Sequence, residues 1–231
     1  LLTPALDGKK PSSCLRICIV AKLWIGQPNY SSWSLRGWLI CKIAELNPET
    51  EWIRFDQDEW RDQVPSRGLV PALELESGWV WDSQAIGETL AEHAPALWPT
   101  DAKARMHARS IVAEMHSGFS ALRAACPMNI RARATDFDLS PEVFADISRV
   151  QDLLEEALAQ FGGTFLYGES LTMADAFYAP VMYRLRTYAP PAHCELADYS
   201  ARLLAHPWLL EWEALGQDEP PIKKYDRLLR S

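Results

Sequence analysis

The chain has 231 residues, of which 48% are hydrophobic and 23% charged, enough for one large or two small globular domains with a buried core. Its formal net charge of −8 disfavours nucleic-acid binding through charge, and no block of like charges predicts a membrane-surface patch. The longest early apolar run, 15–25, is interrupted by Arg16 and Lys22 and is too short to span a bilayer.

Cysteine and histidine usage disfavours two further classes. The five cysteines include no Cys-x-x-Cys pair, so their pattern is typical neither of a disulfide framework nor of a zinc ribbon. The five histidines show no metal-ligand spacing. We therefore expect a cytoplasmic protein without a bound metal.

The N-terminal part alternates strand and helix patterns after a Pro-, Gly- and polar-rich extension over 1–15. The elements expected here are strands at 16–23, 51–55, 71–76 and 79–82, and helices at 33–46 and 83–93. The last two strands are joined by Ser77-Gly78, which predicts a hairpin. A strand-helix-strand unit followed by a hairpin and a helix predicts an α+β domain over 16–95 with a parallel first strand pair.

After a short linker, every apolar pattern is helical. Helices are expected at 102–126, 141–161 and 172–188, with shorter ones within 195–215. Thr100 is the expected N-cap of the first, whose apolar stripe comprises Met106, Ile111, Met115, Phe119, Leu122 and Cys126. Thr172 and Asp175 form a capping box that opens an apolar helix, which we expect in the core. The sequence thus predicts an all-helical domain over 101–231.

The loop after the first strand carries three serines within 29–34, and three interpretations are open. The serines cap the following helix, or Ser31 completes a glycosylation sequon with Asn29, or a serine hydroxyl faces a ligand. The sequon has a meaning only in a secreted protein, which the composition does not favour.

Two further motifs each allow a structural and a functional interpretation. Pro71 at the start of a strand is either an ordinary edge-strand proline or part of a cis Val70-Pro71 bond that offers the backbone of Val70 to an extended ligand. Asp82 and Ser83 begin a helix, where they either only cap it or help its free N–H groups to bind a carboxylate.

In this order and spacing, these motifs resemble the glutathione transferases over roughly residues 16–215. The serine loop is most similar to the serine-type, zeta-like bacterial branch, whose signature Ser-Ser-Cys-x-x-Arg here reads Ser31-Ser32-Trp33-Ser34-Leu35-Arg36. The resemblance implies a thioredoxin-like N-terminal domain, an all-helical C-terminal domain, a homodimer and glutathione as cosubstrate.

The resemblance also implies the thiol and peptide contacts of glutathione. Ser31 would donate its hydroxyl to the glutathione sulfur, with Ser32 as the rival if the loop register differs by one residue. Val70, before Pro71, would pair with the cysteinyl backbone, and Trp33 would line the same site.

The ends of glutathione and the second substrate are assigned in the same way. Asp82 and Ser83 would hold the γ-glutamyl end, and Arg67 would reach the glycyl carboxylate because Leu69 stands where many relatives have a basic or amide residue. The electrophile pocket between the domains would be lined by Trp24, Tyr30, His116, Phe119, Met128 and Asn129.

The activity implied is attack of the glutathione thiolate on a small hydrophobic electrophile, in a detoxification role. A hydroxyl donor and a helix N-terminus both favour the thiolate, so the residues suit this chemistry. Two alternatives stay open: a glutathione-dependent cis-trans isomerase of the maleylacetoacetate type, and a non-catalytic ligand-binding protein of the same fold. Trp33 replaces the signature cysteine, which weakens the isomerase alternative.

Overall fold

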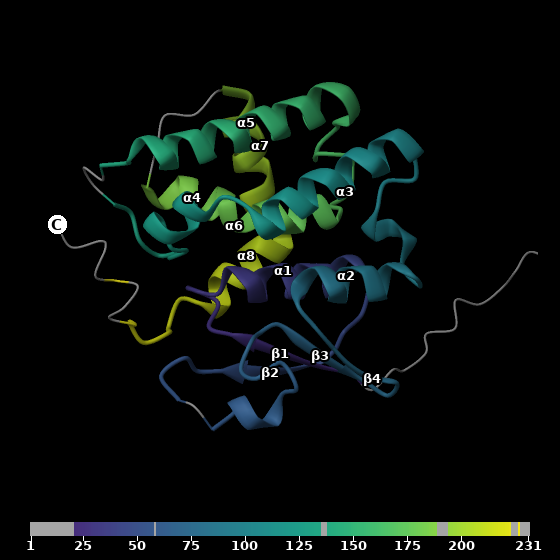
Figure 1. Cartoon of the computed structure of the whole chain (residues 1–231), viewed down its shortest axis with the longest axis vertical. Helices are drawn as coiled ribbons and strands as arrows, with labels where there is room; N and C mark the ends of the chain where they lie inside the picture. The colour runs from purple at the N-terminus through teal and green to yellow at the C-terminus, as the bar shows by residue number, and fades with distance from the viewer. Residues whose placement is uncertain (1–20, 58, 135–137, 189–193, 223–225, 227–231) are drawn as a thin grey trace, which may run out of the picture.

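The computed structural model of the chain places a small sheet beneath two layers of helices (Figure 1). The residues it describes are 21–57, 59–134, 138–188, 194–222 and 226. The predicted extension at 1–15 and the first part of the predicted strand at 16–23 lie outside them.

The strands form one mixed, four-stranded sheet in the order β2-β1-β3-β4. They are β1 (Lys22–Gly26), β2 (Glu49–Ile53), β3 (Ala72–Leu75) and β4 (Gly78–Trp81). β1 is parallel to β2 and antiparallel to β3. β3 and β4 form the predicted hairpin, but its two connecting residues are Glu76 and Ser77 and not Ser77 and Gly78, because Gly78 pairs with Leu75 within the sheet. β1 runs on past the predicted end at residue 23, because Ile25 continues the apolar alternation and is fully buried beside the helices.

Helices α1 (Ser32–Ile43) and α2 (Ser83–Ala91) lie between the sheet and the C-terminal helices (Figure 1). α1 ends before the predicted residue, Leu46, because Glu45 adopts a left-handed conformation with φ 55°. A short 3-10 helix, η1 (Arg61–Gln63), lies in the connection between β2 and β3. A Cβ on Gly37 would lie 2.7 Å from the side chain of Pro71, so the glycine allows α1 to approach the start of β3.

Seven helices of the described residues follow. They are η2 (Pro95–Leu97), α3 (Ala102–Ser117), α4 (Ser120–Ala125), α5 (Pro141–Phe161), α6 (Met173–Tyr188), α7 (Cys194–Leu204) and α8 (Pro207–Leu215). The single helix predicted at 102–126 is wrong: Phe119 is left-handed, at φ 57° and ψ 43°, and divides it into α3 and α4. The predictions for α5 and α6 are confirmed.

Two predictions about the first C-terminal helix are also wrong. Its N-cap is Asp101 and not Thr100, because the Asp101 carboxylate accepts a hydrogen bond of 2.8 Å from the N–H of Ala104. Met106, expected in the buried stripe, is 70% exposed.

The hydrophobic core is continuous between the sheet part and the helical part. α6 is buried along almost its whole length and packs on α1. At its start, the buried carboxylate of Asp175 accepts a hydrogen bond of 2.8 Å from the N–H of Thr172, as the capping box predicts, and a second bond of 2.9 Å from the Thr172 hydroxyl. Among the described residues, no helix combines the length and apolar character needed to cross a bilayer.

Candidate functional site

The serine loop between β1 and α1 positions its first serine inward. Ser31 is buried and is the N-cap of α1: its Oγ accepts from the N–H of Ser34 at 3.3 Å. The Ser31 hydroxyl donates to Oγ of Ser34 at 2.7 Å, and that oxygen also accepts from the N–H of Gly26 at 2.8 Å. The hydroxyl of Ser31 is thus used within the protein, and the capping interpretation holds for this serine.

Ser32 lies differently. It is only partly buried, and its Oγ accepts a hydrogen bond of 3.3 Å from Nη2 of Arg184, on α6. Within the described residues, no acceptor takes the hydrogen of the Ser32 hydroxyl. Since Arg184 occupies a lone pair of the oxygen, that hydrogen is available to a ligand.

Arg184 is held rigidly where it meets Ser32. It is buried, and its guanidinium also donates to the backbone oxygens of Cys126 (2.8 Å) and Pro180 (3.3 Å). Burial lowers the pKa of Arg184 to about 10, so it remains charged at neutral pH. A fixed positive charge next to a serine hydroxyl suits a site that stabilises an anion.

The segment before β3 has the backbone arrangement that the sequence left open. The Val70-Pro71 bond is cis, Pro71 is buried, and Val70 is partly exposed. Leu69 is 69% exposed, and Arg67 is exposed with φ 54°. No described contact joins the side chain of Arg67 to Ser32 or to α2.

At the start of α2, two side chains differ in how they are satisfied. Asp82, with φ 74°, caps the helix by accepting from the N–H of Gln84 (2.8 Å) and of Ala85 (3.3 Å). Ser83 is fully buried, and its Oγ has no hydrogen-bond partner in the part of the chain that the structure describes. Buried polar groups are nearly always paired, so a hydroxyl without a partner at a helix N-terminus indicates a place for a polar group of a ligand.

Around Trp33 the structure gathers positive charge; the sequence predicted Trp33 and His116 as site residues, but not Arg36 and Arg123. We call Trp33, Arg36, His116 and Arg123 the Trp33 cluster. The guanidinium carbons of Arg36 and Arg123 lie 4.7 Å and 4.6 Å from the centroid of the Trp33 ring. His116 meets that ring edge-on at 5.3 Å, and its Nε2 lies 3.3 Å from a carboxylate oxygen of Asp82.

The charges in the Trp33 cluster are desolvated. Burial, followed by repulsion from Arg184 and Arg123, lowers the pKa of Arg36 to about 9. Burial also lowers the pKa of His116, and Asp82 opposes that shift. The cluster therefore carries the charges of two arginines next to a histidine that is less readily protonated than usual.

The residues predicted to line an electrophile pocket do not all meet. His116 and Phe119 lie beside the Trp33 cluster or at the turn that leads to it. Trp24 packs with Ile53 and Trp60 on the sheet face that points away from the helices. The structure therefore does not bring Trp24 to the other predicted residues.

Tyr30, Met128 and Asn129 lie at the other end of the serine loop. The hydroxyl of Tyr30 donates to Asp226, and Nδ2 of Asn129 donates to the same carboxylate at 2.9 Å. Met128 is 1% exposed, within the core. Tyr30 and Asn129 therefore contact the C-terminal segment, at Asp226.

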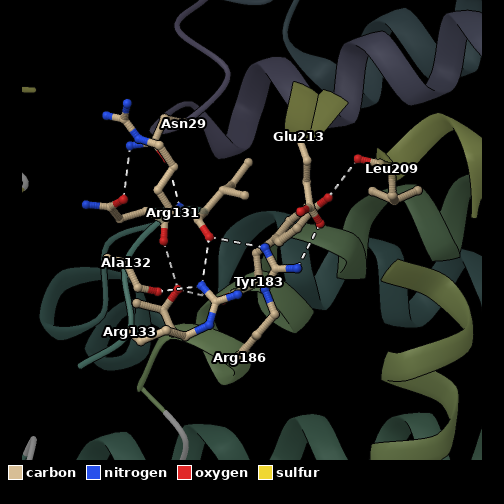
Figure 2. A network of polar contacts seen from close by, with 11 residues as sticks. Asn29, Arg131, Ala132, Arg133, Tyr183, Arg186, Leu209 and Glu213 are labelled. Atoms are coloured by element: carbon tan, nitrogen blue, oxygen red, sulfur yellow. Dashed lines mark hydrogen bonds and ion pairs between the residues drawn. The ribbon is translucent and has the colours of Figure 1, made fainter. Parts of the chain in front are cut away.

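A polar network anchors this end of the loop to the helical part (Figure 2). The N–H of Arg131 donates to Oδ1 of Asn29 at 3.1 Å. Arg186, on α6, donates to the Ile130 oxygen at 3.1 Å and pairs with Glu213, on α8, at 2.8 Å. The loop is thus connected through 130–133 to two helices of the C-terminal part.

The C-terminal segment 217–222 adds a second anchor. Glu219 accepts from the N–H of Asn29 at 2.9 Å, and Nη1 of Arg131 donates to the backbone oxygens of Gln217 (2.9 Å) and Glu219 (2.7 Å). Burial raises the pKa of Glu219 to about 7, against the opposing effects of the Asn29 N–H and Arg131. A carboxylate with that pKa makes the anchor sensitive to pH near neutrality.

We expect this anchor to lose stability as the pH rises from about 4.3 to about 7. An unfolded glutamate has a pKa of about 4.3, so the folded protein holds this proton more tightly, and its contribution to folding falls between those two pKa values. In thermal melting across this range, the melting temperature of Glu219→Gln should rise relative to that of the parent protein as the pH increases. Asp218→Asn, at an exposed neighbour, is the control. A difference in melting temperature that does not change with pH would contradict this assignment.

No grouping of potential metal ligands is present among the described residues. A family model described as "Glutathione S-transferase, N-terminal domain" matches residues 30–93, and one described as "Glutathione S-transferase, C-terminal domain" matches residues 130–215.

One curated relative and two solved structures illustrate the similarity. The chain is 31% identical to "Probable maleylacetoacetate isomerase 1" of Drosophila melanogaster over 133 residues, which are 57% of this chain and 52% of that protein. The match thus spans about half the length of the relative.

A glutathione transferase homolog from "BURKHOLDERIA GL BGR1", solved with bound glutathione, has a TM-score of 0.67 and 20% identity, covering 86% of this chain and 99% of that one. Maleylacetoacetate isomerase from Anaeromyxobacter dehalogenans, solved with bound GSH, has a TM-score of 0.63 and 22% identity, covering 88% and 99%. At these identities the two structures show that the fold is shared.

Proposed function

Because the chain belongs to the glutathione S-transferase family, we propose that it is an enzyme that binds glutathione and transfers its thiolate to a small electrophile. The observation that carries this proposal is the Ser83 hydroxyl, which is fully buried at the N-terminus of α2 and has no partner among the described residues. A carboxylate of the γ-glutamyl end would satisfy both this hydroxyl and the helix dipole. Glutathione is the ligand bound in two of the similar structures.

We propose Ser32, and not Ser31, as the residue that activates the thiol. Glutathione's thiol, like other free thiols, has a pKa near ~8.5, so little of it is ionised at neutral pH. The Ser32 hydroxyl has a free hydrogen to donate to the sulfur, whereas Ser31 donates to Ser34. The positive charge of Arg184 behind Ser32 strengthens that donation.

The reaction then follows ordinary nucleophilic substitution. The thiolate sulfur forms a bond to the electrophilic carbon, and the leaving group departs with its electron pair. Ser32 stabilises the sulfur anion before the attack, and the cis Val70-Pro71 segment would pair with the peptide backbone of glutathione.

A second candidate is a glutathione-dependent cis-trans isomerase. The observation in its favour is the similarity to a probable maleylacetoacetate isomerase. In that reaction the thiolate adds to a double bond and is expelled after rotation, so the same residues would serve.

The family also supports a cytoplasmic homodimer. Size-exclusion chromatography with light scattering would test whether the protein is a dimer.

Titration calorimetry with glutathione tests the proposal. The parent protein is expected to bind glutathione, and Ser83→Ala to bind it about 10- to 100-fold more weakly, because a hydrogen bond to a charged group is lost. Ser110→Ala, at an exposed serine of α3, is the matched control and should bind as the parent does. If equilibrium dialysis detects no binding at millimolar glutathione, the chain is a ligand-binding protein of this fold and the enzyme proposal is wrong.

A further inference from the structure

A cavity of about 280 Å³ lies between the end of β2, the start of the serine loop and the C-terminal segment 217–222. Its apolar walls are formed by Pro28, Trp52, Ile53, Leu215 and Pro220. Trp52 is 42% exposed and Leu215 is 44% exposed, so two large apolar side chains from different elements leave surface open here. An apolar cavity of about 150 Å³ is enough to bind benzene, so this one can hold a molecule of one or two rings.

The cavity is separate from the candidate glutathione site. In the sheet order β2-β1-β3-β4, the cavity adjoins β2, at one edge. The cis Val70-Pro71 bond precedes β3 and Ser83 follows β4, both on the other side of β1. The residues described as lining the cavity do not include Ser32, Val70 or Ser83. A molecule bound in the cavity would therefore leave the expected glutathione contacts free.

Glu219 contributes a carboxylate to the cavity wall. The side chain is partly buried, and its Oε2 accepts a hydrogen bond of 2.9 Å from the N–H of Asn29, which fixes its position. Among the described residues, no donor meets its other oxygen, Oε1, and no basic side chain forms an ion pair with it. A partly buried carboxylate in an apolar wall is stabilised by a ligand that supplies a positive charge.

The other polar side chains in the wall are already engaged. Arg54 donates to both carboxylate oxygens of Asp56, from Nε at 3.1 Å and from Nη2 at 2.8 Å. Oε1 of Gln27 accepts from the N–H of Phe55 at 3.2 Å. Because the two-point pair balances the charge of Arg54, Glu219 carries the charge without an ion-pair partner among the described residues of the wall.

We propose that this cavity binds a small organic cation, an arylalkylammonium ion, with Glu219 as its charge partner and Trp52 as its aromatic wall. The ammonium group would donate a hydrogen bond to Oε1 of Glu219, while the apolar part of the molecule covers Trp52 and Leu215. An indole ring also attracts a cation to its face. This site is independent of the function proposed above, because none of its contacts involves glutathione.

Titration calorimetry with 2-phenylethylammonium and 2-phenylethanol tests the selection for positive charge. The two molecules have nearly the same shape and differ in the charged group. At about pH 8, we expect the parent protein to bind the ammonium ion about 10- to 100-fold more tightly than the alcohol, because it alone donates a charged hydrogen bond to the carboxylate. The anion 3-phenylpropanoate should bind no more tightly than the alcohol.

The pH dependence of binding identifies Glu219 as the charge partner. Burial raises the pKa of Glu219 to about 7, against the effects of the Asn29 N–H and of Arg131. Of the other charged groups on this side of the loop, Arg131 donates to backbone oxygens of the C-terminal segment, and Asp226 accepts from Tyr30. Since Glu219 must be ionised to pair with the ammonium ion, the affinity should rise about 10-fold from about pH 6 to about pH 8.

Three variants separate the contributions. Glu219→Gln keeps an acceptor for the N–H of Asn29 but no charge, and should remove both the preference for the ammonium ion and its pH dependence. Asp218→Asn removes the same charge from an exposed neighbour and is the matched control, which should bind as the parent does. Trp52→Leu retains the carboxylate and should weaken the binding of ammonium ion and alcohol alike. Circular dichroism and thermal melting confirm that the variants are folded.

Four results would overturn the site. They are no binding of the ammonium ion at millimolar concentration, equal affinity for the alcohol, tighter binding of 3-phenylpropanoate, which would assign the cavity to Arg54, or a preference for the ammonium ion that survives Glu219→Gln. Titration in saturating glutathione should give the same affinity, and competition would place the cation in the glutathione site instead. Failure of the proposed function is distinct, because it appears as absent glutathione binding while the ammonium ion still binds.

Discussion

Ser32→Ala is expected to lower kcat/KM for glutathione conjugation by about 100-fold and to raise the pKa of the bound thiol towards its value in water. The Ser32 hydroxyl has a free hydrogen and a charged donor, Arg184, at 3.3 Å behind its oxygen. Removing one preorganised donor to a reacting anion has an effect of about 100- to 1000-fold in other enzymes. The thiolate absorbance of the glutathione complex, followed against pH, measures the thiol pKa directly.

Ser31→Ala provides the matched comparison one residue away. It removes the N-cap of α1 and the bond to Ser34, so the free energy of unfolding should fall by about 1 kcal/mol. The thiol pKa should stay that of the parent complex. The reverse pattern, with the thiol affected by Ser31→Ala alone, would restore the first motif serine as the catalytic residue.

Asp175→Ala is expected to cause the largest loss of stability, about 3–5 kcal/mol. Its buried carboxylate accepts from Leu166 N–H (3.2 Å), the Tyr199 hydroxyl (3.0 Å) and two donors of Thr172. Truncation leaves these donors buried without an acceptor, each of which costs about 1–3 kcal/mol before the structure relaxes. Urea unfolding followed by tryptophan fluorescence measures the loss.

The control for Asp175 is Asp198→Ala, at an exposed residue of α7. That variant should remain within about 0.5 kcal/mol of the parent. If both variants unfold at similar urea concentrations, the Asp175 network does not hold α6 in place as described.

The fold was predictable because its patterns are local and agree with the family. Strand alternation, the Ser77-Gly78 turn and the Thr172 box each depend on a few neighbouring residues, and the two-part architecture they predict is the one observed. The break at Phe119 was not predictable in this way. The apolar spacing continues across it, and a left-handed phenylalanine has no glycine to mark it.

The candidate site was predictable only where the chain itself brings residues together. Asp82 and Ser83 are adjacent, and their position at a helix start follows from the pattern. The choice between the two serines depends on Arg184, which is 152 residues away in sequence. The Trp33 cluster likewise joins separate helices, and its single arginines on α1 and α4 form no local pattern in the sequence.

The anchor between Asn29 and Glu219 has a consequence for protein synthesis. These residues are separated by 190 positions, so the ribosome makes the serine loop long before it makes the segment that holds it. A nascent chain that ends before residue 217 lacks the Glu219 contact with Asn29 and retains the contact between Asn29 and Arg131. The complete loop is therefore a late product of translation, and truncated chains would hold it by one of its two anchors.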